Sequence, residues 1–219
     1  MSNEQDSGAS TALSSPDSRA REAQILGAPP RIAPLTPEEA FDLAIENTAS
    51  LRRAASRDAE NLSLADIPEL VFTLLKHPDL YQAIAALSIQ LLGRGRLSPR
   101  DRELAVLRTA WLWQAPYEWG EHVKLAHAAG VTSAEIERVT AGSAAPGWDD
   151  HAAALLRAVE ELCEDAMISD ATWAVLAKRL DEQQLFELPV LVGQFTNVAF
   201  FQNALRLRLE DHNPGLSAR

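Results

Sequence analysis

Helix signals recur along this chain from residue 36 onward, and no stretch alternates apolar and polar residues over a useful length. Several segments open with Ser or Thr followed by Pro, or by Glu three residues later, and both patterns are typical of helix starts. A half-buried strand would need period-two alternation. The sequence therefore predicts an all-α bundle of many helices with no sheet. The expected helices are 36–54, 64–77, 78–95, 98–114, 116–129, 132–142, 149–166, 169–180 and a long one from 181.

The helical region forms a single predicted domain, residues 35–212, whose central motifs lie in 98–140. Residues 1–34 are rich in Ser, Ala, Pro and acidic residues and contain no aromatic residue, so we expect a flexible tail. A short C-terminal tail is expected at 213–219. Pro189 should kink the last helix or mark a boundary in it.

Charge and cysteine content exclude several classes of protein. The net charge is -11 and no Lys/Arg cluster is present, so nucleic-acid binding is not expected. The single cysteine, Cys163, cannot form an intramolecular disulfide or a Cys-rich metal site. No signal-peptide pattern and no apolar run of about 18 residues occurs, so we expect no membrane span and a cytoplasmic location.

The stretch "YEWGEH", from Tyr117 to His122, places a glutamate and a histidine on one helix face. On a helical wheel, Glu118 and His122 both fall within the apolar arc of 116–129. A carboxylate on such a face loses hydration worth several kcal/mol unless it finds a partner, and side chains at i, i+4 can contact each other. Two interpretations stay open: a structural pair between helices, or a site in which His122 transfers protons and Glu118 orients it. Tyr117 and Trp119 flank the pair and could form a pocket wall.

The preceding helix adds a third acidic residue, Glu103, with Arg102 and Arg108 nearby. The arginines either form a solvated face or hold a substrate carboxylate, which a guanidinium can bind with two hydrogen bonds. Glu103, Glu118 and His122 are possible metal ligands, but three ligands from two helices do not by themselves define a metal site. We therefore expect no metal. The remaining histidines are expected at the surface: His77, His127, His151 and His212.

The block "LSPRDRELAVLRTAWLWQAPYEWGEHVKLAHAAGVTSAEIERV" resembles the carboxymuconolactone decarboxylase family, whose relatives include the alkylhydroperoxidase-D-like proteins. By spacing, Glu103 and His122 match a glutamate and a histidine of the peroxidase branch. The two cysteine positions of that branch fall on Ala115 and Glu118, and neither residue can form a thiolate. The decarboxylase branch carries a glutamate four residues before its histidine, as Glu118 and His122 do. The chain therefore resembles the non-redox branch.

This resemblance implies an orthogonal helical bundle and a cofactor-independent lyase of aromatic-compound catabolism. The reaction would be decarboxylation of a small carboxylated lactone or a related carbonyl-conjugated acid. His122 would act as general acid/base, Glu118 as its orienting partner and Glu103 as a second acid/base, with Arg102 or Arg108 on the substrate carboxylate. The resemblance also implies a homotrimer or homohexamer, with a small-molecule partner and neither nucleic acid nor membrane. The alternatives are a peroxidase-related antioxidant protein and a non-catalytic, oligomeric ligand-binding protein.

Overall fold

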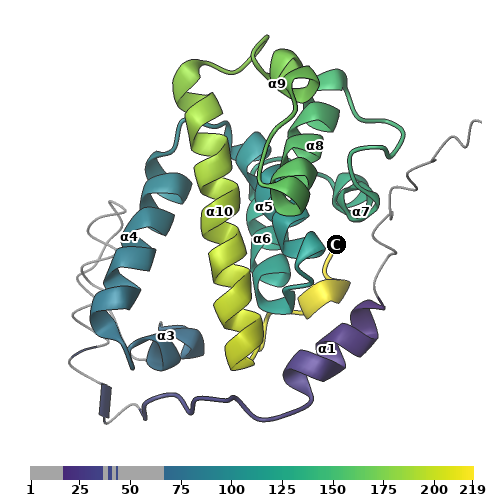
Figure 1. Cartoon of the computed structure of the whole chain (residues 1–219). Helices are drawn as coiled ribbons and strands as arrows, with labels where there is room; N and C mark the ends of the chain where they lie inside the picture. The colour runs from purple at the N-terminus through teal and green to yellow at the C-terminus, as the bar shows by residue number, and fades with distance from the viewer. Residues whose placement is uncertain (1–16, 37–38, 41–42, 44–66) are drawn as a thin grey trace, which may run out of the picture.

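The computed structural model describes residues 17–36, 39–40, 43 and 67–219. Within these ranges the chain forms helices and no strand, which confirms the all-α prediction (Figure 1). The helices are α1 (Ser18–Leu26), α3 (Glu69–Leu74), α4 (Pro78–Arg94), α5 (Pro99–Leu112), α6 (Pro116–Ala128), α7 (Ser133–Ala141), α8 (Asp150–Asp165), α9 (Asp170–Leu176) and α10 (Glu182–Leu205), followed by the short 3-10 helix η2 (Gly215–Ser217).

The bundle is built around α5, which packs against α6, α7, α8 and α10 (Figure 1). Every residue from 103 to 111 is buried, so this helix has no solvent face over more than two turns. Its small and aliphatic residues allow this close approach from several sides, and Leu104 and Leu107 are fully enclosed. A polar side chain on this part of α5 must therefore find its partner inside the protein.

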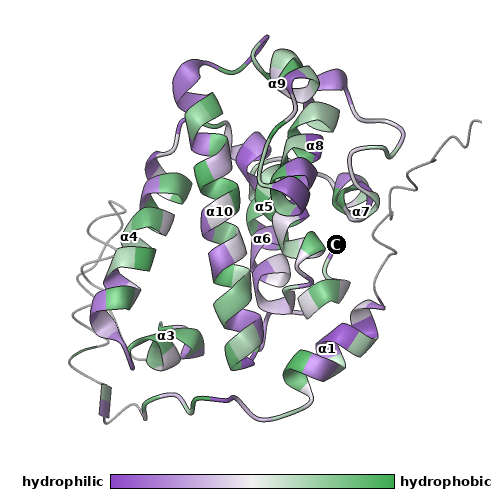
Figure 2. Ribbon diagram, in the orientation of Figure 1, coloured by the Kyte–Doolittle hydropathy of each residue, from purple (hydrophilic) through white to green (hydrophobic). Residues whose placement is uncertain are grey.

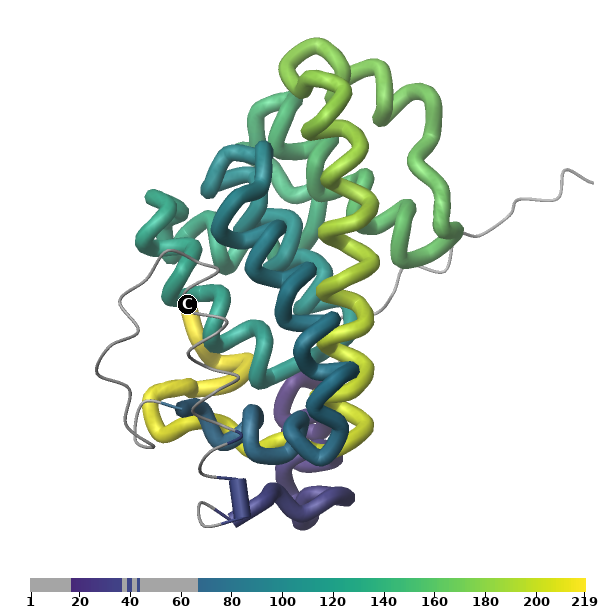
Figure 3. Tube along the Cα trace, turned by 90° about the vertical axis from the view of Figure 1, so that its left-hand side faces the viewer, coloured from purple at the N-terminus to yellow at the C-terminus, as the bar shows by residue number. Residues whose placement is uncertain are grey.

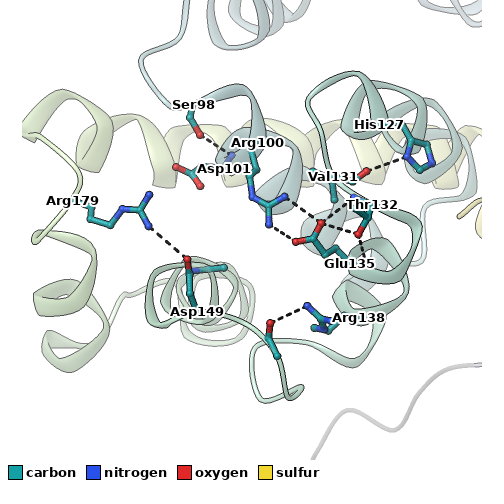
Figure 4. Close-up of polar contacts among 12 residues, drawn as sticks. Ser98, Arg100, Asp101, His127, Val131, Thr132, Glu135, Arg138, Asp149 and Arg179 are labelled. Atoms are coloured by element: carbon teal, nitrogen blue, oxygen red, sulfur yellow. Dashed lines mark hydrogen bonds and ion pairs between the residues drawn. The ribbon is translucent and has the colours of Figure 1, made fainter.

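Polar contacts at the N-terminal end of α5 fix where the helix begins (Figure 4). The Ser98 hydroxyl accepts a hydrogen bond from the Asp101 backbone N–H at 3.0 Å, and Pro99 occupies the first helical position. Arg100 forms an ion pair with Glu135 of α7, and Glu135 also closes a capping box with Thr132. The pair ties α5 to α7, and it sets the position of Glu103 about one turn further along.

The helix α10 is long and apolar and lies alongside α4 (Figure 3). Hydrophobic positions follow it along its length (Figure 2), and Leu188, Leu191 and Phe195 are buried in the main core. The helix continues through Pro189, so of the two predicted effects of this proline the boundary is wrong, and the kink stays a prediction. In the described part of the chain, no helix is long and apolar enough to cross a bilayer.

The C-terminal segment is part of the core, and the prediction of a tail at 213–219 is wrong. Leu216 and Ala218 are buried in the main hydrophobic cluster. The Trp119 indole Nε1 donates a hydrogen bond to the Ala218 carbonyl at 3.1 Å. The segment is short and polar in composition, but its two apolar residues cover α6 and complete the packing around Trp119.

The N-terminal prediction is wrong for residues 18–26, which form α1. The Asp17 side chain caps this helix, Ile25 is buried, and the Glu22 carboxylate accepts a hydrogen bond from the Leu216 backbone N–H. Residues 1–16 lie outside the described ranges. Most of the expected helix 36–54 also lies outside them, although the capping contacts between Thr36 and Glu39 are present at 2.7 and 3.2 Å.

Candidate active site

A buried carboxylate and a histidine meet at the interface of α5 and α6. Glu103 is fully buried, and its Oε2 lies 2.7 Å from Nδ1 of His122. Arg102 donates from Nε to Oε1 of Glu103 at 2.8 Å. Burial acts to raise the pKa of Glu103, but the hydrogen bonds and charges of His122 and Arg102 hold that pKa below its ordinary value. Glu103 is therefore an ionised carboxylate that accepts from both neighbours.

An ionised Glu103 determines which imidazole nitrogen carries the proton. The carboxylate can only accept, so Nδ1 of His122 must be the donor, and the neutral ring is left with an unprotonated Nε2. Among the described residues Nε2 has no hydrogen-bond partner, and 8% of the His122 side chain is exposed. The Phe195 ring of α10 packs edge-to-face on the imidazole at 5.0 Å between ring centroids. The ring is thus held on two sides, with one nitrogen available for proton transfer.

Glu118 lies one helical turn before His122 on α6, but it does not orient the histidine. It is 2% exposed, and both carboxyl oxygens lack a hydrogen-bond partner in the described part of the chain. Burial raises the pKa of Glu118 well above its ordinary value. The predicted orienting role belongs to Glu103 instead, because only Glu103 has a cation beside it to offset the loss of hydration. Burial therefore favours the protonated, neutral form of the Glu118 carboxyl group, and this form can donate a proton.

The two arginines selected from the sequence have different positions. Arg102 supports Glu103 and also donates from Nη1 to the Leu92 carbonyl of α4 at 2.9 Å. Arg108 is buried at the junction of α7 and α8, where it pairs with Glu160 at 2.8 Å and donates to the Val139 carbonyl at 2.9 Å. The Arg108 contacts connect helices, and they do not bring its guanidinium to His122.

The flanking aromatic residues contact the C-terminal segment. The Tyr117 hydroxyl donates to Oε1 of Glu210 at 3.1 Å, and Trp119 is fully buried against Trp111. The predicted pocket wall of Tyr117 and Trp119 is therefore part of the packing between α6 and the chain end. The aromatic ring that contacts His122 is Phe195, which sequence reasoning did not select. No local spacing pairs α10 with α6, so the sequence holds no direct signal for this contact.

His151 is the other buried histidine, which corrects its predicted surface position. It is 6% exposed, and its Nε2 lies 3.3 Å from Oδ2 of Asp101, in ion-pair range but without hydrogen-bond alignment. The predicted surface positions of the other three are confirmed: His77, His127 and His212. Across the described ranges, no three His, Cys, Asp or Glu side chains are grouped closely enough to hold a metal ion.

The positions that would need thiols for a redox cycle hold Ala115 and Glu118. The single cysteine, Cys163, lies on α8 and packs against the main core, as expected from the sequence. Burial raises the pKa of its thiol, which lowers the thiolate fraction and hence its reactivity.

Comparison with known proteins agrees with this architecture. Residues 78–161 match the model of the carboxymuconolactone decarboxylase family, and this match contains Glu103, Glu118 and His122. A similar solved structure is that of a protein of unknown function from Agrobacterium tumefaciens, described as a candidate antioxidant defence protein AhpD. It is 19% identical, the TM-score is 0.56, and the alignment covers 62% of this chain and 94% of that one, so the likeness is one of fold. No curated protein sequence matches this chain. Residues 78–161 are thus similar to the carboxymuconolactone decarboxylase family, and the fold is similar to that of the Agrobacterium tumefaciens protein.

Proposed function

We propose that the protein is a cofactor-independent lyase that decarboxylates a small carboxylated lactone or a related carbonyl-conjugated acid. The observation that supports this most strongly is the buried hydrogen bond of 2.7 Å between Glu103 and Nδ1 of His122, extended by Arg102. A histidine held by an ionised carboxylate on one nitrogen, with the other nitrogen free, is the arrangement that general acid/base catalysis requires.

The reaction needs an acceptor for electrons and a donor for a proton. When the bond to the carboxylate carbon breaks, carbon dioxide leaves and the electron pair moves through the conjugated carbonyl to its oxygen. The neutral acid of Glu118, on the same face of α6 as His122, donates a hydrogen bond to that oxygen as negative charge develops. Nε2 of His122 takes up a proton from water before this step, and the imidazolium then delivers that proton to carbon and returns to the neutral ring.

A peroxidase is the alternative that the description of the Agrobacterium tumefaciens protein suggests. Thiol-based peroxide reduction needs a reactive thiolate, and its disulfide step needs a second thiol. The chain has one cysteine, and Cys163 is half-buried with a raised pKa. We therefore favour the lyase, and we expect no Cys163-dependent peroxide turnover.

The test is the release of carbon dioxide from a panel of carboxylated lactones. The rate with His122→Gln should fall about 10²–10⁴-fold, the usual contribution of a general acid/base. His127→Gln is the matched control, because His127 is an exposed histidine on the same helix. Equal rates for wild type and His122→Gln would reject the assignment. If wild type turns over none of the lactones and His122→Gln has a sharply lower melting temperature, a ligand-binding protein is favoured. The Glu103–His122 pair would then serve stability only.

We also propose that the protein self-associates through the face formed by α4 and α10. Leu80 and Leu87 of α4 are 51% and 38% exposed, and Phe186 of α10 is 74% exposed. Large apolar side chains in water on two adjacent helices favour a contact between copies of the chain. Light scattering after size-exclusion chromatography should give a trimer or hexamer for wild type, and a smaller species for Phe186→Glu. A monomeric wild type would contradict the proposal.

A further inference from the structure

A cavity of about 490 Å³ lies between α1 and the C-terminal end of α10. Its volume is within the range of small-molecule sites, about 300–1,000 Å³. The lining residues that matter here are three arginines, two aromatic residues and one amide: Arg21, Arg31, Arg206, Trp113, Phe200 and Asn203. Figures 1 and 3 show α1 close to the end of α10 and to the C-terminal segment.

The cavity is positively charged in a protein whose net charge is -11. No acidic residue lines it, and its three arginines form no ion pair within the described ranges. Arg21 donates to the Gln24 side-chain oxygen at 2.6 Å, and Arg31 donates to the Ala204 carbonyl at 3.0 Å. These acceptors are neutral and occupy few of the five donors that each guanidinium has. Three guanidinium groups without a carboxylate partner among the described residues favour an anion between them.

The cavity lining also contains two aromatic residues, which pack against each other. Trp113 and Phe200 pack edge-to-face, with 4.9 Å between ring centroids. The Trp113 indole donates to the Thr196 hydroxyl at 3.0 Å, and Asn203 donates to the Trp113 carbonyl at 3.1 Å. Phe200 nevertheless remains 52% exposed. An exposed aromatic surface of fixed position beside three arginines suits a flat ring that carries negative charge.

This cavity is separate from the site around His122. Trp113 follows Glu103 by ten positions on or just beyond α5, a separation of about 15 Å along a helix axis. The segments 21–31 and 200–206, which build most of the walls, lie outside the family match of 78–161. Apart from Trp113, the cavity lining therefore lies outside the part of the chain that the family region includes.

We propose that this cavity binds a small aromatic carboxylate. The guanidinium groups of Arg21, Arg31 and Arg206 hold the carboxylate oxygens, and the ring lies against Trp113 and Phe200. The proposal does not depend on the reaction at His122, so binding here and turnover there are separate measurements.

Calorimetric titration of the whole chain with phthalate, which has two carboxylates on one ring, tests the proposal. Saturable binding is expected, weaker at higher salt because exposed charges are screened. Benzamide, a neutral ring, should not bind, and inorganic phosphate should bind more weakly than phthalate. Arg206→Gln should raise the phthalate Kd at least tenfold, while Arg208→Gln, which removes an exposed arginine outside the cavity, should leave it unchanged.

Phe200→Ser tests the aromatic wall and should also weaken phthalate binding while phosphate binding stays the same. Melting temperatures of all variants establish that each is folded. The absence of saturable phthalate binding to wild type would overturn the proposal, and so would equal Kd values for wild type and folded Arg206→Gln. Phosphate binding as tight as phthalate would overturn the role of the ring.

Discussion

Replacing Glu118 by glutamine should change how the stability of the protein depends on pH. Glu118 is buried, its two carboxyl oxygens have no hydrogen-bond partner in the described part of the chain, and burial raises its pKa well above the ordinary value. In the unfolded chain a glutamate ionises at about pH 4.3. Between that pH and the raised folded pKa, the folded protein holds one proton that the unfolded chain has released.

This difference in bound protons determines how steeply the free energy of unfolding changes with pH. The stabilisation that Glu118 contributes is fully present below its unfolded pKa, and it declines as pH rises toward the folded pKa by about 1.4 kcal/mol per pH unit. Glu118→Gln removes the titration and keeps the shape of the side chain. Measured from about pH 5.5 to about pH 7.5, the stability of the variant relative to wild type should therefore rise at this slope for as long as the pH stays below the folded pKa of Glu118. If the difference levels off within this range, the pH at which it does so marks the folded pKa of Glu118.

Urea unfolding of wild type and Glu118→Gln at several pH values measures this relative stability. Glu164→Gln is the matched control, because Glu164 is exposed and its carboxylate stays in water in both states. The control should give a difference from wild type that does not vary with pH. Parallel stability curves for wild type and Glu118→Gln would refute the reasoning, because they would mean that Glu118 is ionised in the folded protein. The proposed role of Glu118 as a proton donor would then fail as well.

Two further predictions concern stability. Gly120→Ala should destabilise the fold by about 1–3 kcal/mol, because the added Cβ would lie 1.7 Å from Oδ1 of Asn213; Gly193→Ala, where no atom lies within 4 Å, should be neutral or stabilising by up to about 1 kcal/mol in the same urea experiment. The hydrogen bond from Arg100 lowers the pKa of Glu135 to about 2. The stability that Glu135 contributes is therefore present above about pH 4.3 and lost as the pH falls toward 2. Glu135→Gln should flatten this acid loss in melting experiments, and an unchanged acid limb would contradict the pairing.

The helices of this protein are readable from the sequence because their signals are local. Ser98 with Pro99, and Thr132 with Glu135, are starts that depend on a few neighbouring residues, and α5 and α7 begin where these patterns predict. The order at both ends of the chain is not readable from the sequence, because it depends on contacts with distant residues. A composition poor in apolar residues does not reveal that Leu216 is buried and that Ala218 accepts a hydrogen bond from the α6 indole.

In the candidate site, too, the local features are readable from the sequence and the contacts between distant residues are not. Sequence reasoning selected Glu103, Glu118 and His122, but it paired the wrong carboxylate with the histidine. Spacing of four residues makes contact between Glu118 and His122 feasible, yet it does not say which carboxyl group has a compensating cation. Arg102, the preceding residue on α5, provides that cation to Glu103, and His122 of α6 contacts the same carboxylate across the packed interface of the two helices. This choice follows from the three-dimensional arrangement of two helices, and one-dimensional spacing does not contain it.

The central claim is that His122 is held by an ionised Glu103 through Nδ1 and keeps Nε2 free for proton transfer. Nitrogen NMR of the imidazole side chains, with the His122 signals assigned by their loss in His122→Gln, measures this directly. At a pH where the ring is neutral, we expect the proton on Nδ1, the chemical shift of an unprotonated nitrogen at Nε2, and loss of this preference in Glu103→Gln. A ring protonated on Nε2 in wild type, or one whose tautomer is unchanged in Glu103→Gln, would contradict the account.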